Sequence, residues 1–104
     1  MIIRFFDSKI EKFIESLEPA VAAKTLRTID LLGTFGNQLK SPNSKNIGGH
    51  LFELRVRGKE EVRIFYTFNK GGAVLLQGFI KKSQRIPLKV MALVRQKLDV
   101  LDVV

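Results

Sequence analysis

The chain lacks cysteine and tryptophan, and it has a single histidine among its 104 residues. Without cysteine it forms neither a disulfide nor a thiolate metal site. One histidine, with no cluster of acidic residues at ligand spacing, argues against a metal centre. No apolar run is long enough to cross a bilayer, and the first ten residues place an acid and two bases where a signal peptide would be apolar. We therefore expect a soluble, cytoplasmic protein with no membrane association, no metal and no other cofactor.

Motifs of several common enzyme classes are also missing. No serine lies in the context of a nucleophile elbow, and the two Gly-Gly pairs lack the lysine and Ser/Thr of a phosphate-binding loop. What remains is a set of cations with two candidate proton carriers: Arg55, Arg63, Lys81, Lys82, Arg85, Tyr66 and His50. Cations suit phosphoryl transfer on RNA, because the 2′-hydroxyl is a built-in nucleophile that needs only orientation and charge stabilisation.

Positive charge is abundant and unevenly distributed over a chain whose formal net charge is +8. Residues 1–39 carry five bases and five acids, whereas residues 40–97 carry thirteen bases and three acids, a net of +10. Such a one-sided basic surface is typical of nucleic-acid binding. The alternative is a basic protein without a nucleic-acid partner.

The stretch 51–85 organises the prediction of the fold. Residues 51–57 and 61–68 alternate apolar and polar side chains, which predicts two strands with one buried face each. Residues 73–80 are almost continuously apolar, which is typical of a strand covered on both faces. Turn residues separate the three segments, so the pattern predicts an antiparallel meander.

The register of the first hairpin follows from its apolar face. A loop of three residues, 58–60, aligns the valines that flank it and places Arg55 opposite Arg63, whereas a loop of two residues mixes the faces. Like charges directly opposite each other cost stability in a sheet. Two interpretations stay open: the arginines bind a polyanion together, or Glu53 and Glu61 neutralise them.

Helices are predicted on either side of the meander. A short strand at 2–6 precedes a helix that starts at residue 8 or 9, where Ser8 and Glu11 have the spacing of a capping box. Pro19 begins a second helix, which ends at the glycines of 33–36. Ala22, Leu26, Ile29 and Leu32 form its predicted apolar stripe.

The remaining segments are a loop and a last helix. Residues 38–50 are polar and predict a long loop, made basic by Lys40 and Lys45. Pro87 opens the last helix. The apolar stripe of this helix is Val90, Met91, Val94, Leu98 and Leu101, with Lys89, Arg95 and Lys97 predicted to face water. The order of strand, two helices, three antiparallel strands and helix predicts one α+β domain over 1–104, with helices packed on a small antiparallel sheet.

Three segments carry a resemblance to a known family. LFELR at 51–55, VRIFY at 62–66 and LLQGFIKKSQ at 75–84, with Pro87, resemble the RelE/HigB superfamily of bacterial toxins, in particular its phage-associated branch. The resemblance implies a RelE-like fold and the toxin of a toxin–antitoxin system. It implies an mRNA interferase, an endoribonuclease that cleaves mRNA in the ribosomal A site by attack of the 2′-hydroxyl without a metal. The implied partners are the mRNA, the ribosome and a cognate antitoxin, usually a helix-turn-helix repressor.

The resemblance also assigns residues. Arg63 matches the arginine that contacts the scissile phosphate, and Lys81 and Lys82 match the basic pair after the last strand. We expect the Arg63 guanidinium to lie on the solvent face of its strand, near Arg55 and this pair. No tyrosine follows that pair, and Gln77 stands where the branch commonly has histidine, so His50 is a candidate acid or base by residue type alone. The predicted catalytic residues are therefore Arg63, Lys81, Lys82 and His50. The predicted RNA-binding residues are Arg55, Arg57, Lys45 and Arg85.

Two other functions stay open at this point. ParE-like toxins share the fold and act on DNA gyrase, although the ELR and FIKK segments favour the ribonuclease. A catalytically inactive module that binds RNA or protein would keep the basic groove and lack acid–base residues, as this chain does.

Overall fold

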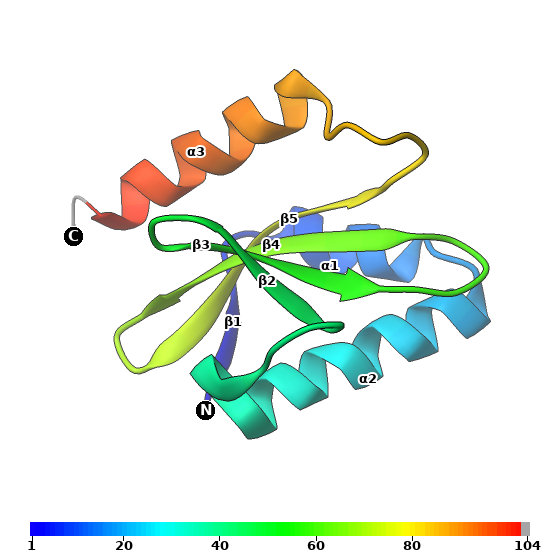
Figure 1. Ribbon diagram of the computed structural model, residues 1–104, viewed down its shortest axis with the longest axis horizontal. Helices are drawn as coiled ribbons and strands as arrows, with labels where there is room; N and C mark the ends of the chain where they lie inside the picture. The colour runs from blue at the N-terminus through cyan, green and yellow to red at the C-terminus, as the bar shows by residue number, and fades with distance from the viewer. Residues whose placement is uncertain (103–104) are drawn as a thin grey trace.

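The computed structural model, which describes residues 1–102, has a five-stranded sheet with helices on both faces (Figure 1). Its elements are β1 (Ile3–Phe5), α1 (Ser8–Glu15), α2 (Pro19–Phe35), the short 3-10 helix η1 (Gly36–Gln38), β2 (Ser44–Gly48), β3 (Leu51–Val56), β4 (Val62–Asn69), β5 (Gly72–Ile80) and α3 (Leu88–Asp102). The strand order is β1-β5-β4-β3-β2. The expected α+β class is confirmed. The sheet is mixed, because β1 runs parallel to β5 while the other neighbours are antiparallel.

Strand β2 corrects the prediction of a loop over 38–50. It pairs with β3 and forms an edge of the sheet, with Ser44 opposite Leu54 and Lys45 opposite Glu53. The sequence pattern missed this strand because its buried side chain is a serine, whose hydroxyl is hydrogen-bonded to the hydroxyl of Tyr66, and not an apolar residue. Without apolar alternation, a polar edge strand is indistinguishable from a loop.

The predicted meander and its register are confirmed. Strands β3, β4 and β5 are consecutive neighbours, and Arg55 lies opposite Arg63 with Val56 opposite Val62. The pairing of β4 with β5 contains an irregularity beside Phe65 and Tyr66. Successive side chains of a strand point to opposite faces, so on β5 Leu75 packs in the core below α1 and α2 and Leu76 packs in the core below α3.

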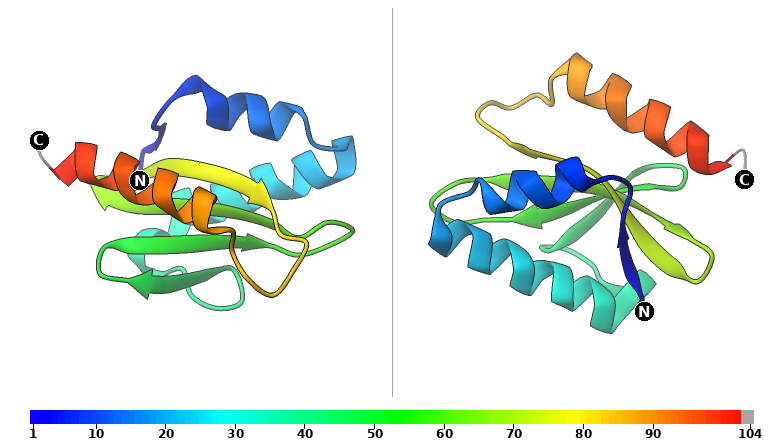
Figure 2. Two further views of the ribbon diagram at one scale, coloured as in Figure 1. Left: turned by 90° about the horizontal axis from the view of Figure 1, so that it is seen from above. Right: turned by 180° about the vertical axis from the view of Figure 1, so that it is seen from behind.

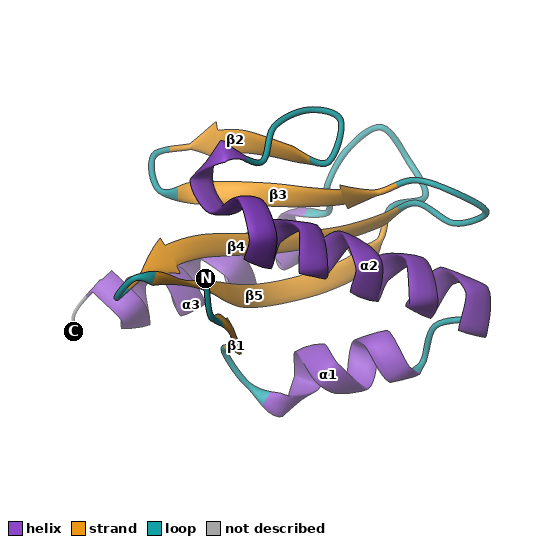
Figure 3. Ribbon diagram, turned by 90° about the horizontal axis from the view of Figure 1, so that it is seen from below, coloured by secondary structure: helices purple, strands orange, loops and turns teal. Residues whose placement is uncertain are grey.

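Helices α1 and α2 lie side by side and cover one face of the sheet (Figures 2 and 3). The core beneath them includes Ile10, Ile14, Val21, Ile29, Leu32, Leu54, Ile64 and Leu75. Helix α1 begins at Ser8 as predicted, although the side chain that caps it is Asp7, which accepts a hydrogen bond from the Lys9 amide. Gly78 lets α1 approach β5, since a Cβ there would lie 2.6 Å from ring atoms of Phe13.

The buried face of α2 differs from the predicted stripe. Leu26 is 50% exposed, and Thr25 and Thr28 face the sheet in its place. Each threonine hydroxyl donates to the backbone carbonyl four residues earlier, at 2.8 and 2.9 Å, so these hydroxyls are buried without losing their hydrogen bonds. The helix runs through Gly33 to Phe35, and Gly36 follows with a positive φ of 55°.

Helix α3 covers the opposite face with the apolar stripe predicted for it. The second core includes Leu51, Phe65, Val74, Leu76 and Val94. Lys97 corrects one prediction, because its ammonium group is turned toward the protein and not toward water. It donates to the Leu76 carbonyl and to Gln77 Oε1, both at 2.8 Å, and lies 3.1 Å from the Asp7 carboxylate. Lys97 thus ties α3 to β5 and to the segment before α1.

Within residues 1–102, none of the helices combines the length and the apolar character that crossing a membrane requires.

Candidate functional site

A basic pocket of about 630 Å³ lies where the β3–β4 hairpin meets the segment that follows β5. Its lining residues are Arg57, Glu61, Arg63, Lys81, Lys82, Ser83 and Gln84, which are four cations, one acid and two neutral polar side chains. The Lys81 amide donates to the Glu61 carbonyl at 2.7 Å, which fastens the segment after β5 to the hairpin. The fold therefore brings together Arg63, Lys81 and Lys82, three of the four predicted catalytic residues, and adds Arg57, which was predicted to bind RNA.

Arg63 forms the floor of this pocket. Its side chain is only 4% exposed, which corrects the expectation that its guanidinium lies on a solvent face. Its Nη2 donates to Glu61 Oε1 and its Nη1 to the Val62 carbonyl, both at 3.1 Å. Its buried Nε has no hydrogen-bond partner within residues 1–102, and the nearest carboxylate oxygen, on Glu53, is 3.9 Å away. The charge of Arg63 is thus fixed in place by its two Nη atoms, while its Nε donates to no described residue.

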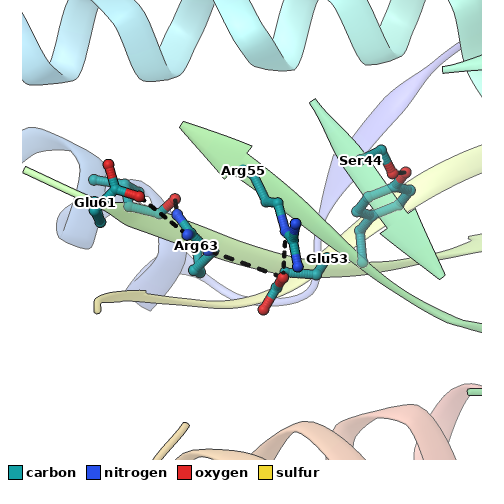
Figure 4. Close-up of polar contacts among 7 residues, drawn as sticks. Ser44, Glu53, Arg55, Glu61 and Arg63 are labelled. Atoms are coloured by element: carbon teal, nitrogen blue, oxygen red, sulfur yellow. Dashed lines mark hydrogen bonds and ion pairs between the residues drawn. The ribbon is translucent and has the colours of Figure 1, made fainter. Parts of the chain in front are cut away.

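Carboxylates neutralise the two opposed arginines, which is the second of the two interpretations that the sequence left open. Glu53, which is 2% exposed, accepts a hydrogen bond from Arg55 Nε at 2.8 Å and also lies near Arg63 (Figure 4). Burial raises the pKa of the Glu61 carboxyl, but the hydrogen bond and charge of Arg63 outweigh burial and hold that pKa below its ordinary value. Glu61 is therefore ionised at neutral pH.

The other three cations of the pocket remain available to a ligand. Lys82 and Arg57 are exposed and Lys81 is half-buried. In the part of the chain that the structure describes, none of the three side chains forms an ion pair. An anion entering the pocket meets these three charges first and the fixed charge of Arg63 beneath them.

The remaining predicted residues lie at different distances from the pocket. Lys45 is opposite Glu53, so it shares the sheet face of Arg55 and Arg63 and is exposed. Arg85 is exposed in the segment between β5 and α3. His50 is exposed in the turn that precedes β3, five residues before Arg55, which is roughly 17 Å along a strand. The structure does not bring His50 to the other predicted catalytic residues.

Tyr66, the other candidate proton carrier, also lies outside the pocket. It is 1% exposed and stacks on Phe52. Burial raises the pKa of its phenol, and the hydrogen bond with Ser44 opposes that rise. A buried, protonated phenol in the core packs the sheet and exchanges no proton with a bound ligand.

Comparison with protein families identifies the family of this chain. The α+β architecture is consistent with a RelE-like fold. Residues 12–99, from α1 into α3, match the family described as phage derived protein Gp49-like. The chain therefore belongs to the Gp49-like family, a toxin-like family of the RelE/HigB type of toxin–antitoxin systems. Membership implies an antitoxin as partner. A comparison with curated proteins gives no match.

Proposed function

We propose that this chain is the toxin of a toxin–antitoxin pair and that it cleaves mRNA on the ribosome. The observation that supports this function best is the pocket itself, in which Arg57, Lys81 and Lys82 present unpaired charge above the fixed guanidinium of Arg63. A phosphodiester carries its charge on two non-bridging oxygens, which several convergent cations bind and stabilise. Family membership supports the toxin role, and the segments of the RelE/HigB pattern support mRNA as the substrate.

The proposed reaction is an internal transfer within the RNA. The 2′-hydroxyl oxygen attacks the adjacent phosphorus and loses its proton, while the bond from phosphorus to the 5′ oxygen breaks. The products are a 2′,3′-cyclic phosphate and a 5′-hydroxyl, whose oxygen takes up a proton. Negative charge grows on the non-bridging oxygens in the transition state, and preorganised cations stabilise it more there than in the ground state.

The pocket contains groups for both proton transfers. Glu61 is the one carboxylate among the lining residues and is the proposed acceptor of the 2′ proton. Its lowered pKa makes it a weak base, so orientation and charge stabilisation supply most of the rate enhancement. The ammonium group of Lys81, whose backbone amide donates to the Glu61 carbonyl, is the proposed proton donor to the 5′ oxygen, and Lys82 binds the phosphate. His50 takes no part in this proposal because of its place at the other end of β3.

The decisive experiment is induction of the chain in cells, followed by mapping of new mRNA 5′ ends. The expected result is growth arrest with cuts in phase with codons on translated RNA. The variant Lys81→Met/Lys82→Met should remove the cuts, whereas Lys89→Met, an exposed lysine on α3 outside the pocket, should keep them. DNA damage dependent on gyrase would point instead to ParE-like action. Arrest without cuts or DNA damage would identify an inactive binding module.

A further inference from the structure

A second, smaller basic pocket lies beside the first. It has a volume of about 190 Å³ and lies at the end of β3, against α2 and the turn before β2. It is lined by Lys24, Arg55 and Arg57, together with the polar residues Thr28 and Asn43, and no acid is among its lining residues. The Arg55 guanidinium pairs with Glu53, so Lys24 and Arg57 supply the positive charge here. Arg57 lines both pockets. The two pockets therefore adjoin at Arg57, at the end of the hairpin.

Contacts between distant segments hold this second pocket in shape. The Lys24 ammonium on α2 donates to the backbone carbonyl of Arg57, which fixes the helix to the end of β3. The Arg55 amide donates to the Asn43 carbonyl at 2.8 Å, which fixes the turn before β2 to the same strand. The Thr28 hydroxyl donates to the Lys24 carbonyl at 2.9 Å. The cations are thus placed by α2, β3 and the turn before a ligand arrives.

We propose that the RNA strand continues from the first pocket into the second, where Lys24 and Arg57 bind the phosphate next to the one that is cleaved. This inference rests on the proposed function. Proteins that bind single strands combine a positive groove along the backbone with weak sequence preference, and two adjoining pockets lined mainly by cations have that character. Arginine binds phosphate oxygens through a fork and lysine through a point charge, so Arg57 and Lys24 suit a phosphate diester.

The test measures binding of a short single-stranded RNA with a 2′-O-methyl group at every position, which prevents cleavage. Fluorescence anisotropy gives Kd between 50 and 200 mM KCl. Each phosphate contact on a single strand contributes about 0.7 to the slope of log Kd against log salt. Lys24→Met should reduce the slope by about that amount, and Asn43→Asp should weaken binding by placing a carboxylate in the pocket. Lys12→Met, an exposed lysine on α1, should leave slope and affinity unchanged.

A second arm locates the phosphate. Replacing single phosphates of the RNA by neutral methylphosphonates should weaken binding to the original chain at one position beside the cleaved one. Lys24→Met should no longer be sensitive to that replacement, as expected when the two changes remove one shared contact.

The outcomes separate this inference from the function on which it rests. RNA binding with a steep salt dependence that both Lys24→Met and Asn43→Asp leave unchanged overturns the second site and leaves the first intact. An original chain that does not bind the free RNA overturns the inference, whereas the proposed function is overturned only if induction produces no new mRNA 5′ ends. Weaker binding of the antitoxin, with unchanged binding of RNA, makes the pocket a protein-binding site and overturns the inference. Asn43→Asp keeps the contact between Lys24 and Arg57, so a folding defect of Lys24→Met does not decide the result.

Discussion

Arg55 and Arg63 lie directly opposite each other on neighbouring strands, and a single carboxylate oxygen of Glu53 lies 2.8 Å from one Nε and 3.9 Å from the other (Figure 4). Two guanidinium groups in this position repel each other, and Glu53 offsets the repulsion inside the protein. The arrangement holds the buried Arg63 side chain in one position beside the basic pocket. It also means that the charge of Arg63 depends on a buried acid for its placement.

Glu53→Gln should therefore destabilise the fold strongly, although the volume of the side chain hardly changes. Removing one partner of a buried ion pair costs about 3–5 kcal/mol, since it leaves the other charge uncompensated. For a domain of this size that loss lowers Tm by more than about 10 °C. Thermal unfolding by circular dichroism measures it. Added sulfate should restore more of the Tm of Glu53→Gln than of the original chain, because an anion can replace the lost carboxylate.

Glu11→Gln is the matched control for this change. Glu11 is exposed in the first turn of α1, where loss of a charge changes stability by about half a kcal/mol. An equal loss of Tm for the two variants would show that Glu53 has no special role between the arginines.

Tyr66→Phe should cost about 1–3 kcal/mol, because the Ser44 hydroxyl is buried and would lose the hydroxyl that it is hydrogen-bonded to. Urea denaturation measures this loss. Ser44→Ala in the Tyr66→Phe background should recover part of it, because two apolar groups leave no unsatisfied hydroxyl. If the double variant is as unstable as the sum of the two single variants, the hydrogen bond does not anchor β2.

Local patterns were sufficient to predict the meander. The apolar faces of 51–57 and 61–68 had to coincide, and only one loop length achieves this, so the opposition of Arg55 and Arg63 followed from the sequence. The same pattern could not show that Arg63 is buried. Burial here depends on packing from distant parts of the chain, and a strand charge with two nearby acids looks the same whether exposed or enclosed.

Features that depend on tertiary contacts were predicted poorly. The buried side chain of β2, Ser44, is hydrogen-bonded to Tyr66 on β4, a strand that is not the neighbour of β2. No periodicity of the sequence encodes that contact. Lys97 lies on the face of α3 that the sequence predicted to be polar, yet its ammonium group turns toward the protein and forms an ion pair with Asp7. The place of Lys24 in the second pocket likewise depends on how α2 lies against β3. In contrast, the four cations of the basic pocket all lie within 40–97, the segment where the bases cluster.

The ion pair of Asp7 and Lys97 should make stability depend on acid pH. Burial raises the pKa of Asp7, but the hydrogen bond and charge of Lys97 outweigh it and hold the pKa below its ordinary value of 3.8. A carboxyl whose pKa is lower in the folded state contributes stability above pH 3.8, and that contribution is lost as pH falls through the folded value. Asp7→Asn keeps a capping side chain for α1 and removes the charge.

The Tm difference between the original chain and Asp7→Asn measures this contribution. Near pH 7 the original chain should be more stable by about 0.5–1 kcal/mol, the range for a partly exposed pair, and the two chains should converge near pH 2. Asp99→Asn, an exposed acid on α3, should show no such convergence. A difference that persists unchanged at pH 2 would mean that Asp7 acts through the cap alone.

The last prediction distinguishes the catalytic contribution of Arg63 from that of Lys82, the exposed lysine of the pocket. Arg63→Lys keeps a positive charge but loses the planar fork that donates to Glu61 and to the Val62 carbonyl. A lysine ammonium cannot hold both contacts, so the charge no longer has one fixed position under the reacting phosphate. If that fixed charge stabilises the transition state, the single-turnover rate should fall by about a hundredfold or more, on the scale of one lost oxyanion donor.

Lys82→Met provides the contrast, because Lys82 is exposed and its charge is mobile. It should raise the concentration of programmed ribosomes needed for half-maximal rate and change the rate at saturation less than Arg63→Lys does. Arg63→Lys should show the opposite division, with a low rate even at saturation, after circular dichroism has confirmed that the variant is folded at the assay temperature. Should Arg63→Lys cleave at the original rate once saturated, Arg63 only positions the RNA, and charge stabilisation belongs to Lys81 and Lys82.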